Sequence, residues 1–129
     1  MSCFLFDITN DDRRALLWYC LGFAMYAGMS PIDKYIKNIL DEGRGGYCGG
    51  DPGWEIDAFD DEGNVLLDES GRRVFRVWAD PDISKIEPDT EYYLFDEVKE
   101  YVRQALVCMR ERMPESRVEV ARILNRYWG

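Results

Sequence analysis

The sequence predicts an α+β fold in which two N-terminal helices, a small antiparallel β-meander and two C-terminal helices pack on one core. Three observations support this fold. Apolar residues recur at helical spacing before residue 40, they alternate with polar residues between glycine-bearing turns at residues 54–78, and helical spacing returns after residue 90. The chain has 129 residues, of which 47% are hydrophobic and 14% aromatic, so we expect a single globular α+β domain over residues 1–129.

The N-terminal part of the chain predicts two helices. Thr9 or Asn10 can cap a first helix that runs to about residue 27. Its apolar run at residues 15–27 is too short for a membrane span, which takes about 20 residues. We therefore expect a buried helix there rather than a membrane segment or a signal peptide. Ser30 and Pro31 begin a second helix, whose apolar positions extend to Leu40.

The central part predicts a loop followed by a meander of three or four strands. Six of the eleven residues at positions 43–53 are glycine, which indicates a loop or hinge, and neither GxGxxG nor GxxxxGK occurs there. Residues 54–59 alternate between apolar and acidic side chains, as in a half-buried strand with Glu55 and Asp57 on one face. Turns at residues 60–64 and 68–71 lead to further strands at residues 65–67 and 73–78.

The C-terminal part predicts two more helices. Thr90 can cap a long helix whose apolar stripe runs from Leu94 to Met109, and this helix should end near Met113 because Pro114 follows. A second helical pattern covers residues 115–128. The arginines of these two helices, from Arg103 to Arg126, alternate with glutamates, which is typical of a solvated helix surface rather than a nucleic-acid interface.

The negative charge is concentrated in one region. Residues 51–100 carry 16 acids against 5 bases, a net charge of -11, whereas the whole chain has a net charge of -9. Such a surface repels nucleic acid and anionic membranes, and it accelerates encounters with basic partners. The composition therefore favours a basic protein as partner, although acidic surface also serves solubility alone.

The residue inventory offers little for catalysis. The chain has no histidine, which removes the commonest base for serine and cysteine nucleophiles. Its four cysteines form no CxxC pair, and the one calcium-like loop, with Gly63 in the sixth position, has Ala58 where the first ligand is required. We expect no metal, no cofactor and no catalytic residue. Cys20 and Cys108 lie in apolar helical runs, where reduced thiols are usual, and this favours a reducing, cytoplasmic location.

In size, acidity, aromatic content and element order, the chain resembles the immunity proteins that bacteria pair with polymorphic or contact-dependent toxins. The resemblance rests on the acidic meander at residues 54–78 and on the acidic stretch at residues 80–100. It implies a function class, tight binding and neutralisation of a toxin domain that is frequently a nuclease, and it assigns no residue a role.

The candidate partner-binding residues are therefore taken from the acidic meander itself. They are Glu55, Asp57, Asp60, Asp61, Glu62, Asp68 and Glu69. Trp54, Trp78 and Trp128 are further candidates for interface anchors if they are exposed. Two alternatives stay open: a phage-type inhibitor or nucleic-acid mimic that binds a host protein, and a carboxylate-dependent enzyme, which would need a deep pocket with two convergent acids.

Overall fold

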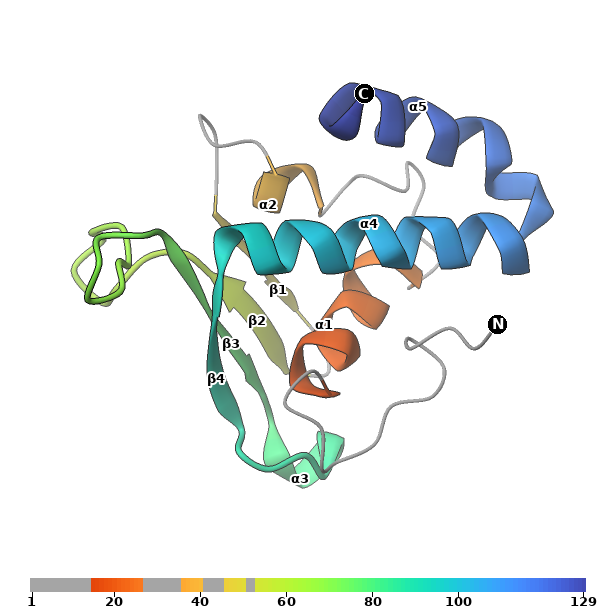
Figure 1. The fold of residues 1–129 in the computed structure, drawn as a ribbon. Coiled ribbons are helices and arrows are strands. Elements are labelled where there is room, and N and C mark those ends of the chain that lie inside the picture. Colours follow the sequence, from red (N-terminus) through yellow and green to blue (C-terminus); the bar gives the residue numbers. More distant parts are fainter. Residues whose placement is uncertain (1–14, 27–35, 41–45, 51–52) are drawn as a thin grey trace.

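The computed structural model describes residues 15–26, 36–40, 46–50 and 53–129 (Figure 1). This part of the chain has a mixed α+β fold, as predicted. The elements in chain order are α1 (Ala15–Tyr26), α2 (Lys37–Leu40), β1 (Tyr47–Gly50), β2 (Trp54–Asp57), β3 (Val74–Ala79), α3 (Pro81–Ser84), β4 (Thr90–Leu94), α4 (Phe95–Arg112), a 3-10 turn (Pro114–Ser116) and α5 (Arg117–Trp128).

The four strands form one antiparallel sheet in the order β1-β2-β3-β4. Helices α1 and α4 pack on one face of this sheet, and α5 packs on α4 (Figure 1). The side chains of the strands alternate between this covered face and the opposite one.

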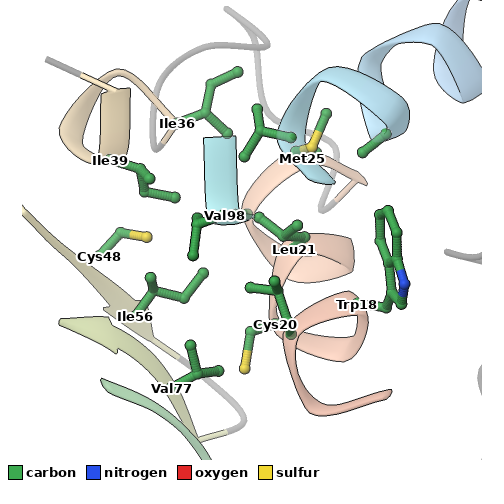
Figure 2. Packing of buried hydrophobic residues seen from close by; sticks show 14 of the residues in the cluster. Trp18, Cys20, Leu21, Met25, Ile36, Ile39, Cys48, Ile56, Val77 and Val98 are labelled. Carbon is green, nitrogen blue, oxygen red and sulfur yellow. The ribbon is translucent and has the colours of Figure 1, made fainter. Parts of the chain in front are cut away.

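A single cluster of buried side chains joins the helices to the covered face. Figure 2 shows Cys48, Ile56 and Val77 of three strands pointing toward Leu21 of α1 and Val98 of α4. The cluster extends into α5 through Val120 and Ile123. Burial of this much apolar surface is the main stabilising contribution to the fold.

Helix α1 confirms the interpretation of the N-terminal apolar run. Leu17 and Leu21 are fully buried in the cluster, so this run is a core helix. Nowhere in the described ranges is there a helix with the length and apolar character that a membrane crossing requires. The proposed caps Thr9 and Asn10, and the second helix's start at Ser30 and Pro31, lie outside the described residues; Lys37–Leu40 of that helix is helical.

The prediction of a loop over residues 43–53 was wrong for Tyr47–Gly50, which form β1. Gly49 explains why a glycine-rich segment can be a strand here. A Cβ atom at this position would lie 2.7 Å from the carbonyl oxygen of Trp54 and 2.9 Å from the hydroxyl of Tyr47. Glycine therefore permits a close cross-strand approach that any larger residue would obstruct.

The prediction that Thr90 caps the long helix was also wrong. Residues Thr90–Leu94 are strand β4, and Leu94 precedes the first turn of α4. Tyr92 and Tyr93 have high strand propensity, and β4 completes the sheet by pairing with β3, so tertiary pairing overrides the helical pattern. The side chain of Glu97 accepts a hydrogen bond from the Leu94 amide at 3.2 Å. The predicted end of the helix beside Pro114 is confirmed.

The cysteines differ in part from the expectation of reduced thiols. Cys20 and Cys48 are free and buried, and burial raises the pKa of the Cys48 thiol to about 12. Cys108, in contrast, is disulfide-bonded. A cysteine on an apolar helix face can form a disulfide or remain a buried thiol. The position of Cys108 on its helix therefore did not determine its redox state.

Candidate functional site

The seven predicted acidic residues lie in two adjoining places. Glu55 and Asp57 are on strand β2. The other five are on a projection between β2 and β3, which we call the acidic tip and define as residues 60–72: Asp60, Asp61, Glu62, Asp68 and Glu69. The tip extends away from the helices, at the left of Figure 1.

The tip is wider than a simple hairpin. Its middle segment was predicted as a strand at residues 65–67, but it joins its neighbours only through the isolated bridges Phe59↔Val65 and Leu67↔Arg73. Strands β2 and β3 pair directly with each other in the body of the sheet. The middle segment is thus inserted between them only where they diverge, beyond the end of β2.

The first turn of the tip is organised by the carboxylate of Asp60. The Oδ1 atom accepts hydrogen bonds from the amides of Glu62 and Asn64, both at 2.9 Å. The Asp60 amide in turn donates to the Asn64 carbonyl at 2.8 Å. Gly63 has a φ of 84°, which favours glycine at this position. The predicted turn is confirmed here.

The second turn repeats this arrangement eight residues later. Asp68 Oδ1 accepts from the amides of Ser70 at 2.9 Å and Arg72 at 2.8 Å, and Gly71 has a φ of 82°. In this turn the aspartate also forms an ion pair, because Arg72 Nε donates to Asp68 Oδ2 at 2.8 Å.

These hydrogen bonds affect the titration of both aspartates. The hydrogen bond donated by the backbone amide of Asn64 is the main cause that lowers the pKa of Asp60. The hydrogen bond from the backbone amide of Arg72 has the same effect on the pKa of Asp68. Both carboxylates therefore maintain their own turns. Asp61, Glu62 and Glu69 are exposed, so these three are the residues of the tip best placed to meet a partner.

Glu55 and Asp57 belong to the sheet face opposite α1 and α4, which we call the outer face. Strand register places its side chains in two rows across the four strands. One row contains Tyr47, Asp57, Arg76 and Tyr92, and the other contains Gly49, Glu55, Trp78 and Thr90. The prediction that Glu55 and Asp57 share a face is confirmed.

Polar contacts fix several side chains of the outer face. The Tyr47 hydroxyl donates to Glu55 Oε2 at 2.9 Å, and this bond raises the pKa of Tyr47. Arg76 lies 3.4 Å from Asp57 and 3.7 Å from Asp61. Because Asp61 is on the tip, Arg76 connects the outer face with the acidic tip.

Sequence reasoning missed Tyr47, Arg76 and Tyr92. Two of them lie on β1 and β4, the strands that were predicted as loop and helix. Trp78, which was named as a possible anchor, is half-buried on the outer face, whereas Trp54 is buried and Trp128 packs against the core. The alternation of apolar and acidic residues at positions 54–57 could have indicated that the strand has a second, polar face. The alternation does not show which strands lie beside β2.

The described residues offer no arrangement suited to metal binding. In these ranges no group of three or more His, Cys, Asp and Glu side chains is placed to hold a metal ion. A surface depression of about 620 Å³ is lined by Pro81, Glu87, Pro88 and Asp89. Glu87 is exposed there, so this depression is not the deep pocket that a carboxylate-dependent enzyme would need.

Comparison of the chain with protein-family models, curated proteins and solved structures yields no match. No residue role is therefore transferred from a relative.

Proposed function

We propose that this protein is an immunity-type binding protein that neutralises a basic toxin domain by covering its positive surface with the acidic tip. One observation carries the proposal: the twin turns hold Asp60 and Asp68 in their own backbone hydrogen bonds and leave Asp61, Glu62 and Glu69 exposed on a projection. Charge that is concentrated on one projecting element suits the recognition of a partner. Charge that serves only solubility can be distributed over the whole surface.

A nuclease domain is the partner that this charge fits best. Nucleases bind phosphate groups and therefore carry positive clefts, which attract an acidic protein over several ångströms. Steering of this kind increases the association rate and is weakened by salt, because exposed charges are screened over about 8 Å at physiological ionic strength. Occupation of the cleft by the tip would exclude the nucleic acid.

The proposal places the protein in the cytoplasm, where an immunity protein must meet the incoming toxin. The disulfide at Cys108 argues in the other direction, because disulfides are typical of oxidising compartments. Cell fractionation, followed by thiol labelling of the protein in each fraction, tests the location.

The binding experiment uses a basic nuclease domain as the partner, sought first among the products of the genes that neighbour this one. The tip variant carries Asp61→Lys, Glu62→Lys and Glu69→Lys, and a matched control carries Asp82→Lys, Glu87→Lys and Glu115→Lys, three exposed acids away from the tip. Both variants change the net charge equally. We expect the tip variant to associate about tenfold more slowly and to protect cells poorly, and the control to behave nearly as the wild type.

Surface plasmon resonance at two salt concentrations measures the association rates, and cell survival during toxin expression measures protection. Equal association rates for the tip variant and the control would mean that the tip is only a solvated surface, and they would refute the proposal.

A further inference from the structure

We propose that the outer face of the sheet is the anchoring part of the same interface, and that it holds arginine side chains of the partner against Tyr47, Trp78 and Tyr92. This inference rests on the proposed function, since it assumes a basic protein partner. It assigns the two regions different tasks: the acidic tip accelerates the encounter, and the outer face slows dissociation.

The exposure of the aromatic residues is the first observation behind this inference. Tyr47 is 47% exposed and Tyr92 is 50% exposed, and both belong to one row of the outer face, on the edge strands β1 and β4. Trp78 adds a half-buried ring in the neighbouring row. Tyrosine, tryptophan and arginine are the residues that contribute most often to interface anchors, and here they occur together on one face.

The position of the helices is the second observation. The described helices lie on the other side of the sheet or beyond its ends (Figure 1). The aromatic side chains of the outer face therefore do not stabilise the core in the way that Ile56 and Val77 do.

The third observation is that side chains of the outer face already contact each other. The Tyr47 ring is tied to Glu55 by its hydroxyl, and the absence of a side chain at Gly49 leaves room for that hydroxyl. Arg76 is held between Asp57 and Asp61. Side chains that such contacts already restrain lose less conformational entropy on binding, which increases affinity.

The chemistry of the face selects the guanidinium group. Glu55 and Asp57 supply carboxylates beside the aromatic rings, and Arg76 shows that the face already accommodates one arginine between two acids. A guanidinium can stack on a ring and donate to a carboxylate in one plane, whereas an ammonium group acts as a hydrated point charge. The face should therefore prefer arginine to lysine in a basic segment.

The test uses hexaarginine and hexalysine peptides as probes on the full-length protein, with hexaglutamate as the negative control. Titrations followed by 15N–1H NMR spectra at low salt give the affinity and the residues whose amide signals shift. For the wild type we expect hexaarginine to bind about three- to fivefold more tightly than hexalysine, with shifts on β1 to β4 as well as on the tip.

Variants separate the two regions. Tyr47→Ser with Tyr92→Ser should equalise the affinities for the two cationic peptides, and Tyr47→Phe with Tyr92→Phe should restore the preference because the rings remain. The variant Glu62→Lys with Glu69→Lys, which leaves the Asp61–Arg76 contact of the outer face intact, should weaken the binding of both peptides by a similar factor and keep the arginine preference. If the serine variant does not fold, the wild-type shift map and the phenylalanine variant decide.

The outcomes distinguish the two proposals. Equal affinities of the wild type for hexaarginine and hexalysine, or shifts confined to the tip, overturn the anchoring role of the outer face and leave the proposed function standing. If neither cationic peptide binds more tightly than hexaglutamate, the proposed function and this inference both fall.

Discussion

The two faces of the four-stranded sheet are built from alternating residues of the same strands, yet their side chains do different things. On the covered face, Ile56, Phe75 and Val77 are fully buried against the helices. On the outer face, Tyr47 and Tyr92 are half-exposed, and the polar side chains between them contact each other. The alternation thus divides each strand into one set of residues for stability and another set available for recognition.

The largest effect that separates the faces should come from Ile56→Ala. Ile56 is fully buried, so the loss of its side chain creates a cavity and should destabilise the protein by about 2–5 kcal/mol. Tyr92→Ala on the outer face is the control, and we expect a clearly smaller loss. Urea denaturation of both variants gives the free energies of unfolding. Equal losses would mean that the outer face is as important for the fold as the core.

Gly49→Ala should have the next largest effect. The new Cβ atom would lie 2.7 Å from the backbone oxygen of Trp54, which cannot move without disturbing β2. Overpacking of this kind costs about 1–3 kcal/mol. Gly50→Ala is the matched control, because its Cβ atom would meet only Trp54 Nε1 at an ordinary 3.9 Å. Thermal melts that show the same midpoint for both variants would contradict the close approach between β1 and β2.

The Asp57–Arg76 pair on the outer face should contribute less. Its side chains are 16% and 28% exposed, so the pair is partly shielded from solvent, and we expect a coupling of about 0.5–1 kcal/mol. A double-mutant cycle with Asp57→Asn and Arg76→Gln measures it. The Glu119–Arg122 pair on α5, where the arginine is 68% exposed, is the control and should show less coupling. A larger coupling on α5 would refute this ranking.

The comparison of the two faces also shows what the sequence could predict. The fold class, the buried α1, the break at Pro114 and the two turns all follow from local patterns: apolar spacing, proline, and the Asp and Gly positions of the turns. Strands β1 and β4 could not be found in this way. β1 depends on the space that Gly49 leaves beside Trp54, and β4 depends on pairing with β3.

The candidate site was predictable to the same extent. The acidic residues of the tip are visible in the sequence because charge is a property of each residue. The outer face is visible only once β1 and β4 are placed, since its rows combine Tyr47, Arg76 and Tyr92 from three strands. Which of the acids remain available for a partner likewise depends on hydrogen bonds, as Asp60 and Asp68 show.

The smallest effect on the fold should come from acid titration of the tip, which lies beyond both faces of the sheet. The pKa values of Asp60 and Asp68 are lowered from the ordinary 3.8 by hydrogen bonds that exist only in the folded turns. The resulting stabilisation is present above pH 3.8 and is lost as the pH falls through the lowered pKa. The turns should therefore persist at pH 4 and open at lower pH, while both aspartates contribute little to the global melting temperature because each carboxylate holds only its own turn.

Amide NMR signals of Glu62, Asn64, Ser70 and Arg72 between pH 6 and 2 follow the two turns separately. Arg72→Ala sharpens the measurement, because it removes the guanidinium from Asp68 and keeps the backbone amide that bonds to it. The midpoint for Asp68 should rise in this variant, and the midpoint for Asp60 should stay where it is. If both midpoints move together, the turns titrate as one unit and the tip is coupled more tightly than its separate hydrogen bonds indicate.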